Sequence, residues 1–174
     1  MVTDPLSIRY HLEKAMYLAT SGRPGPVWLD IPLNVQASQI DPDQLTGFDP
    51  AELSEPWKDT DLNKVSKEIF EKIAQAKRPI VFAGGGVRLS GQHQAFIQLV
   101  EKLGVPVVTG WNAHDVIWNA HPNYVGRPGS IGDRAGNFAV QNADLLLILG
   151  SRLNIRQVSY NWKSFAREAY KIWV

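Results

Sequence analysis

The sequence contains no cysteine, which excludes disulfide bonds, thiolate metal sites and a thiol nucleophile and which fits a cytoplasmic protein. It also lacks an excess of either charge, since 18 basic and 17 acidic residues leave a formal net charge of +1. The Arg and Lys residues are scattered rather than gathered in a stripe, so we expect no nucleic-acid partner. No apolar run approaches the roughly 20 residues that a membrane-spanning helix needs, so we expect no membrane partner either.

Residues that usually carry catalysis or bind metals are also sparse. The four histidines do not have the spacing of a metal-binding pair; they are His11, His93, His114 and His121. The sequence shows no Ser-His-Asp combination, no P-loop and no recognisable pair of acidic residues in a pocket. We therefore predict that this chain contains neither a catalytic residue nor a metal ligand.

What the chain does contain is a short apolar run, Arg78 to Gly86, that ends in a triple glycine. Such a run is typical of a strand buried on both faces of a parallel sheet. A helical pattern follows, with apolar residues such as Phe96 and Val100 on one face, and then a second short strand at residues 105–110. Strand, glycine turn, helix and strand form a βαβ unit, which places ligands at the carboxyl ends of its strands.

Further elements extend this unit toward the end of the chain. Residues 144–150 are its most hydrophobic run and predict a central strand. Asp133 is expected to cap a preceding helix whose Phe138 and Ala139 face inward, and a last strand is expected around Ile172. The pattern predicts an α/β fold: a Rossmann-like parallel sheet flanked by helices.

The first part of the chain predicts a separate structure. Asp4 and Pro5 mark the start of a helix with Leu12 and Met16 on its inner face. Residues 27–31 have the composition of a strand.

A linker is expected next, because residues 37–60 are rich in Pro, Gly, Asp and Ser, and Thr60 or Asp61 then begins another helix. The helix at the very start and the strand pattern at the very end suggest a piece of a longer protein, truncated at both ends. Such a piece exposes apolar faces and a sheet edge, so we expect a homo-oligomer or packing against further domains.

The triple glycine is a poor match to the NAD-binding fingerprint. Gly84 and Gly86 take its first and third places, but Leu89 stands in the last. The next strand ends in Thr109-Gly110, without an acid for a ribose. A standard NAD site is therefore not expected, and the glycines indicate either the close approach of another ligand or a bare tight turn.

Three strands in this part of the chain end in glycine, at Gly86, Gly110 and Gly150. In a parallel sheet these ends lie at one edge, where a ligand could run over the backbone. The arginines nearby in the sequence are Arg127, Arg152 and Arg156. Arginine forks suit a pyrophosphate; the alternative is that they are surface arginines beside structural turns.

Two stretches resemble the thiamine diphosphate-dependent enzymes, particularly the acetolactate synthase-like members. Ser21 to Pro32, with its Gly-Arg-Pro-Gly-Pro-Val and Asp-Ile-Pro, is similar to the end of the family's N-terminal pyrimidine-binding domain. From about Leu62 onward the sequence is similar to the central domain, including the Pro79 to Gly86 stretch and the strand-turn from Asp144 to Arg152. The resemblance implies a parallel sheet flanked by helices, which in acetolactate synthases binds FAD across its strand ends.

The resemblance also implies the residues that would contact FAD or an ADP-like nucleotide. They are Gly84, Gly85, Gly86, Thr109, Gly110, Trp111, Asn112, Gly126, Arg127, Gly150, Ser151, Arg152 and Arg156. After Arg152 the family continues with Phe-Asp-Asp-Arg, whereas this chain reads Leu153-Asn154-Ile155-Arg156. Arg156 thus stands in the arginine's place, and both acids are replaced.

By the same resemblance, residues 1–36 are the end of the pyrimidine-binding domain, 37–60 a linker and 61–174 a central domain that is incomplete at its C-terminus. The family's activating glutamate and its motif for magnesium and thiamine diphosphate belong to the other domains, so the chain alone is expected to be inactive. The implied function is that of a cofactor-binding central domain in an enzyme that acts on 2-keto acids. The alternatives are a structural domain that spaces the catalytic domains and, third, a free-standing nucleotide-binding module.

Overall fold

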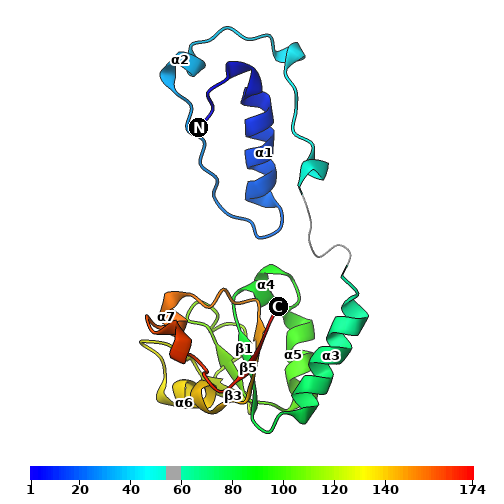
Figure 1. The fold of residues 1–174 in the computed structure, drawn as a ribbon, viewed down its shortest axis with the longest axis vertical. Helices are drawn as coiled ribbons and strands as arrows, with labels where there is room; N and C mark the ends of the chain where they lie inside the picture. The colour runs from blue at the N-terminus through cyan, green and yellow to red at the C-terminus, as the bar shows by residue number, and fades with distance from the viewer. Residues whose placement is uncertain (54–59) are drawn as a thin grey trace. The chain divides into compact units, whose positions relative to one another are not determined.

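The computed structural model describes residues 1–53 and 60–174, which form two compact units, Met1–Thr60 and Asp61–Val174 (Figure 1). Residues 54–59, which are part of the predicted linker, lie outside the described residues.

The first unit is built on helix α1 (Ile8–Thr20), which follows directly from the 3-10 turn η1 (Pro5–Ser7). Asp4 caps this start as predicted, because its carboxylate accepts a hydrogen bond from the N–H of Leu6 at 3.0 Å. The remaining elements of the unit are α2 (Leu33–Gln36), η2 (Pro42–Gln44) and η3 (Pro50–Glu52). The Tyr10 hydroxyl donates to Glu52 at 2.8 Å, which fixes η3 against α1.

The prediction of a strand at residues 27–31 is wrong. The segment is extended, but among the described residues it forms no ladder; its Asp30 carbonyl accepts one hydrogen bond, from the N–H of Val2 at 2.8 Å. The expected inner face of α1 is also exposed, with Leu12 at 47% and Met16 at 66% of their full accessibility. An apolar pattern reports a preference for burial, and burial requires a partner surface that this unit does not provide.

The second unit contains a five-stranded parallel sheet in the order β3-β2-β1-β4-β5. Its strands are β1 (Pro79–Ala83), β2 (Val107–Thr109), β3 (Tyr124–Gly126), β4 (Leu145–Leu149) and β5 (Tyr170–Trp173). In the centre, Val81 of β1 is in register with Val107 of β2 and with Leu147 of β4. The predicted α/β fold with a parallel sheet is confirmed.

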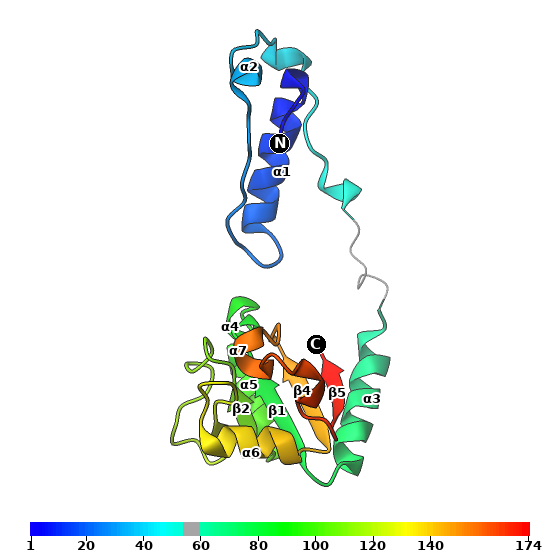
Figure 2. The ribbon, with the colours of Figure 1, turned by 60° about the vertical axis from the view of Figure 1, so that its left-hand side comes forward.

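Helices cover both faces of this sheet (Figure 2). The long helices are α3 (Leu62–Gln75), α5 (His93–Leu103) and α6 (Arg134–Asn142), and the short elements are α4 (Gly86–Leu89), α7 (Ile155–Val158) and η4 (Trp162–Ser164). α3 and α5 contribute Ile73 and Val100 to the apolar cluster on one face. α6 contributes Val140 to the cluster on the other face, so the central strands are buried on both sides.

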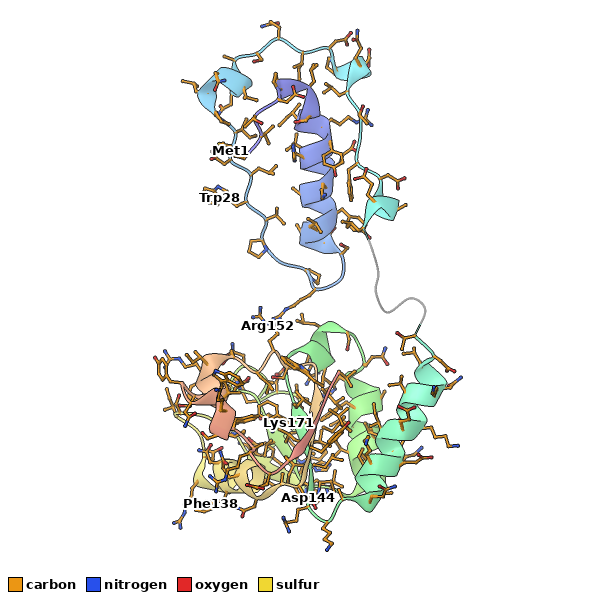
Figure 3. The ribbon with its side chains drawn as sticks, viewed as in Figure 1. Met1, Trp28, Phe138, Asp144, Arg152 and Lys171 are labelled. Carbon is orange, nitrogen blue, oxygen red and sulfur yellow. The ribbon has the colours of Figure 1, made fainter. Side chains whose placement is uncertain are left out.

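Asp61 caps α3 as expected, accepting hydrogen bonds from the N–H groups of Asn63 and Lys64 at 3.1 Å. Two details of α6 differ from the prediction. Phe138 faces outward, with 58% of its accessible surface exposed (Figure 3), and Asp133 makes no capping hydrogen bond. The helix buries its other side instead, where Gly136 and Val140 meet the sheet.

Candidate functional site

The carboxyl ends of β2, β1 and β4 lie side by side, as the glycine-ended runs predicted. From β1 the chain proceeds outward to β2 and β3, and it then returns to the other side of β1 for β4 and β5. The strand order therefore reverses between β1 and β4, and a parallel sheet offers its ligand crevice at such a switch point. We call this region the carboxyl edge; it comprises residues 84–86, 109–112, 126–132 and 150–157.

Three of the glycines at the carboxyl edge bring two main chains into close contact. A Cβ atom at Gly84 would lie 2.5 Å from Cα of Ser151, and one at Gly86 would lie 2.7 Å from Cα of Gly150. The N–H of Gly86 donates to the Gly150 carbonyl at 2.9 Å, and Gly150 has a φ of +60°, which glycine adopts without strain. The opposite main chain therefore fills the space on the side-chain side of Gly84, Gly86 and Gly150, which favours the tight-turn alternative for these three positions; ligand contact with their backbones stays a prediction.

Gly85 differs from its neighbours. The nearest atom to a Cβ there would be the Asn112 carbonyl oxygen at 3.7 Å, an ordinary van der Waals distance, so this position is open. Thr109 and Gly110, by contrast, are buried in the fold. The Thr109 hydroxyl has no hydrogen-bond partner among the described residues, and Gly110 lies against the side-chain amide of Gln157. Of these positions, Gly85 and the exposed Asn112 are the ones that a ligand could reach.

A pocket of about 300 Å³ opens at the carboxyl edge beside β2. It is lined by Trp111, Pro128, Gly129, Ile131, Gly132 and Arg156. The Trp111 side chain is 52% exposed, so its indole can stack on a flat ring. The pocket thus combines an aromatic surface with the positive charge of Arg156.

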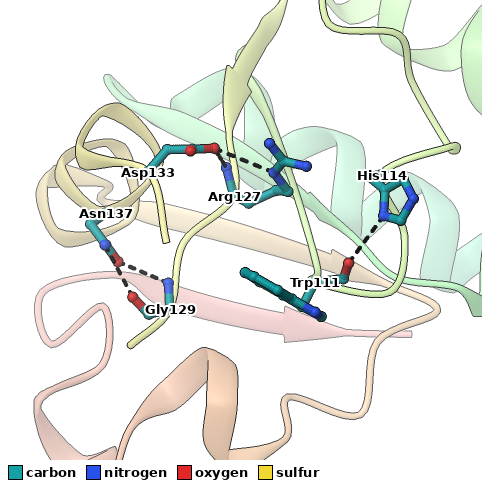
Figure 4. Close-up of polar contacts among 6 residues, drawn as sticks. All are labelled: Trp111, His114, Arg127, Gly129, Asp133 and Asn137. Atoms are coloured by element: carbon teal, nitrogen blue, oxygen red, sulfur yellow. Dashed lines mark hydrogen bonds and ion pairs between the residues drawn. The ribbon is translucent and has the colours of Figure 1, made fainter. Parts of the chain in front are cut away.

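The loop at residues 126–132 is fixed to the start of α6 (Figure 4). The main-chain N–H of Arg127 donates to Asp133 Oδ2 at 2.8 Å, and its Nε lies 3.4 Å from the same oxygen. Asn137 pairs with Gly129 in both directions, since its Oδ1 accepts from the Gly129 N–H at 2.9 Å and its Nδ2 donates to the Gly129 carbonyl at 3.2 Å. Because Asp133 already pairs with Arg127, this arginine offers less charge to a phosphate than its position in the sequence suggested.

Ser151 is buried, and its Oγ lies 3.3 Å from Gln157 Oε1 and accepts from the N–H of Leu153 at 3.2 Å. Arg152 and Arg156 are exposed, and neither pairs with an acidic side chain in the described part of the chain. Figure 3 shows Arg152 beyond the carboxyl end of β4. These two arginines are the cations of the carboxyl edge that a phosphate group could bind.

The amino end of β4 carries Asp144, whose carboxylate has a structural role. It accepts hydrogen bonds from the main-chain N–H groups of Lys77 and Arg78, both at 2.8 Å. Burial by itself raises the pKa of the Asp144 carboxyl. The two hydrogen bonds and the charge of Arg78 together lower it by more than burial raises it, so the pKa lies below its ordinary value. Asp144 thereby ties the start of β1 to the start of β4.

The family model described as the central domain of thiamine pyrophosphate enzymes matches residues 66–174, which include the whole sheet and most of its covering helices. The chain belongs to the thiamine pyrophosphate-dependent enzymes. Within that family it is similar to acetolactate synthases, as its sequence motifs predicted.

Three relatives illustrate the similarity. A probable acetolactate synthase large subunit of Methanococcus aeolicus is 36% identical over 163 residues, which are 89% of this chain and 26% of the relative. The acetolactate synthase large subunit of Corynebacterium glutamicum is 34% identical over 174 residues, covering 97% of this chain and 26% of the relative. The large subunit of acetolactate synthase isozyme 2 of Escherichia coli is 30% identical over 164 residues, covering 91% and 28%. The chain therefore spans about a quarter of the length of these relatives.

The carboxyl edge of this domain combines two exposed arginines, an accessible backbone position and a pocket. Arg152 and Arg156 suit a pyrophosphate, Gly85 leaves its backbone accessible, and the pocket beside Trp111 admits a planar ring. The described residues contain no group of three or more His, Cys, Asp or Glu side chains that could hold a metal ion. Nor do they include a helix long and apolar enough to cross a membrane.

Sequence reasoning missed two residues that organise the carboxyl edge, Asn137 and Gln157. Gln157 stands three residues after Asn154, and this spacing is that of a capping box, which the structure contains. That signal could have placed Gln157 at the start of α7. Asn137 has no comparable signal, because its partner Gly129 becomes a neighbour only when the loop folds back on α6.

Proposed function

We propose that residues 61–174 form a nucleotide-binding central domain in an acetolactate synthase-like enzyme that acts on 2-keto acids. The ligand is an ADP-like group, most simply that of FAD, bound along the carboxyl edge with its pyrophosphate at Arg152 and Arg156. The observation that carries this proposal is the position of these two exposed arginines, without acidic partners in the described residues, beside the point where the strand order reverses.

The site residues divide by the contact that each is proposed to make. Arg152 and Arg156 bind the phosphates, Gly85 and Asn112 present backbone to the ligand, and Trp111 stacks on a ring. The remaining residues are proposed to hold the main chain of the carboxyl edge in position; they are Gly84, Gly86, Thr109, Gly110, Gly126, Arg127, Gly150 and Ser151. In this arrangement the chain supplies binding and orientation, whereas thiamine diphosphate and magnesium are held by other domains of the intact enzyme.

We further propose that residues 1–36 are the end of a pyrimidine-binding domain and residues 37–60 a linker. Large apolar side chains of the first unit are exposed, including Trp28 at 90% and Leu33 at 80%. Exposed apolar groups of this kind support packing against the other domains or a second copy in a homo-oligomer. The intact protein is proposed to be cytoplasmic.

A structural function is the second candidate, and a specific observation favours it. Gly84, Gly86 and Gly150 serve contact between main chains, so three of the expected ligand positions are explained without a ligand. In this alternative the domain spaces the catalytic domains, and its carboxyl edge binds no ligand.

Titration with FAD, followed by flavin fluorescence, separates the two candidates. Under the binding proposal the chain binds FAD, and Arg152→Ala weakens binding by about 1.5–3 kcal/mol, the usual contribution of a charge-assisted hydrogen bond. Lys102→Ala is the matched control, because it also removes one exposed positive charge but lies in the last turn of α5, before the amino end of β2. Equal affinity of the parent and Arg152→Ala, or no binding by the parent, would favour the structural function.

A further inference from the structure

Gln157 connects the end of β2, the end of β4 and helix α7 through one buried side chain. It is 8% exposed. Its Oε1 accepts from the N–H of Asn154 at 3.1 Å and from the Ser151 hydroxyl at 3.3 Å. Its Nε2 occupies the space into which a Cβ atom on Gly110 would project. The amide is therefore in contact with two strand ends at once.

The residue before it, Arg156, faces the proposed ligand and also holds the neighbouring loop. Arg156 is one of the residues that line the pocket beside Trp111. Its carbonyl accepts from the N–H of Ser130 at 2.9 Å, so the position of Arg156 and that of the loop are linked. Asn137 holds the same loop from the other side, through Gly129. The wall of the pocket thus depends on how firmly α7 is fixed to the sheet.

We propose that Gln157 is a positioning residue that fixes α7 so that the Arg156 guanidinium is held at the phosphate-binding position. This inference rests on the proposed nucleotide binding. The physical reason is that α7 has four residues, Ile155–Val158, too few to be stable by itself. In its first turn, the Gln157 side chain accepts a buried hydrogen bond from the hydroxyl of Ser151, just after β4, and this bond keeps α7 in place. A rigid arginine loses less conformational freedom on binding a ligand.

The test is a double-mutant cycle between Gln157 and Arg156 in the full chain, with ADP as the probe and isothermal titration calorimetry as the measurement. Gln157→Met preserves most of the volume and removes the amide. We expect Arg156→Ala to weaken ADP binding about tenfold or more in the parent, as the loss of one charge-assisted hydrogen bond would. In the Gln157→Met background the same change should weaken it less than about twofold, because the arginine is no longer held in position.

Controls make each outcome decisive. Gln141→Met, on the exposed side of α6, should leave the effect of Arg156→Ala unchanged. Gln157→Glu keeps the acceptor for Asn154 and serves if Gln157→Met does not fold; there Arg156→Ala should again weaken ADP binding. If the parent binds ADP and Arg156→Ala weakens binding equally in the parent and in the Gln157→Met background, the positioning role alone is overturned. The positioning role alone is also overturned if Arg156→Ala no longer weakens binding in the Gln157→Glu background. A parent that binds neither ADP nor FAD overturns the proposed function and this inference together.

Discussion

Replacing Gly84 with alanine tests whether the ends of β1 and β4 are in direct main-chain contact. The added Cβ would lie 2.5 Å from Cα of Ser151 and 2.7 Å from the carbonyl carbon of Gly150. Carbon atoms pack comfortably at about 3.5–4.0 Å, so the two chains would have to separate by about 1 Å. That separation would strain the hydrogen bond from the Gly84 N–H to the Leu149 carbonyl, now 2.8 Å long.

Overpacking of this kind costs about 1–3 kcal/mol, and the loss of a hydrogen bond adds about 1 kcal/mol. We therefore expect Gly84→Ala to lower the free energy of unfolding by about 2–4 kcal/mol. The measurement is urea denaturation followed by far-UV circular dichroism. Because the clash involves main-chain atoms on both sides, no side-chain rotation can relieve it.

Gly85→Ala is the matched control, one residue away. Its φ of −61° and ψ of −18° suit any residue, and its Cβ would lie 3.7 Å from the nearest atom, the Asn112 carbonyl oxygen. Alanine there should leave stability unchanged or raise it by up to about 1 kcal/mol, because it restricts the unfolded chain. Equal stability of Gly84→Ala and Gly85→Ala would refute the close contact between the two main chains.

Three further predictions concern stability and activity. The lowered pKa of Asp144 means that its stabilising effect is complete above the ordinary carboxyl pKa and is lost as pH falls through the lowered value. The urea midpoints of the parent and of Asp144→Asn should therefore differ at neutral pH and converge in acid. A difference that stays constant with pH would contradict this. Ser159 is exposed with a φ of +65°, so Ser159→Gly should raise the free energy of unfolding by about 1 kcal/mol in urea denaturation, and a loss of stability would argue against strain there. The chain given pyruvate, thiamine diphosphate and magnesium should form no acetolactate or acetaldehyde in a product assay, and accumulation of either would show that the chain is catalytic by itself.

The central strands could be predicted because their burial on both faces leaves a simple pattern. β1 and β4 are runs of apolar residues bounded by Pro79 or Asp144 at one end and by glycine at the other, and their length is typical of a strand and too short for a helix. β3 could not be predicted, since only one of its three residues is buried, whereas all three of β2 are, and it pairs with β2 through a register shift. The strand prediction for residues 27–31 was wrong because these residues have the composition of a strand but no neighbouring strand to pair with in the described part of the chain.

The candidate site was predictable in position but not in detail. Parallel-sheet topology places Gly86, Gly110 and Gly150 at one edge whatever their roles. Sequence does not distinguish a glycine that admits a ligand from one that admits another main chain, and here Gly85 is open whereas Gly86 is not. The pairing of Arg127 with Asp133 and the burial of Gln157 likewise depend on how the loops fold over the sheet.

The central claim is that the carboxyl edge binds an ADP-like group over Gly85, and FAD titration of the chain beside its Gly85→Val variant tests it most directly. The Cβ of the valine would contact only the Asn112 carbonyl oxygen, at an ordinary 3.7 Å, so the variant should keep the fold and block the ligand. Far-UV circular dichroism would verify the fold. We predict saturable quenching of flavin fluorescence by the parent and no binding by Gly85→Val. Absence of binding by the parent, or equal binding by the two proteins, would contradict the claim.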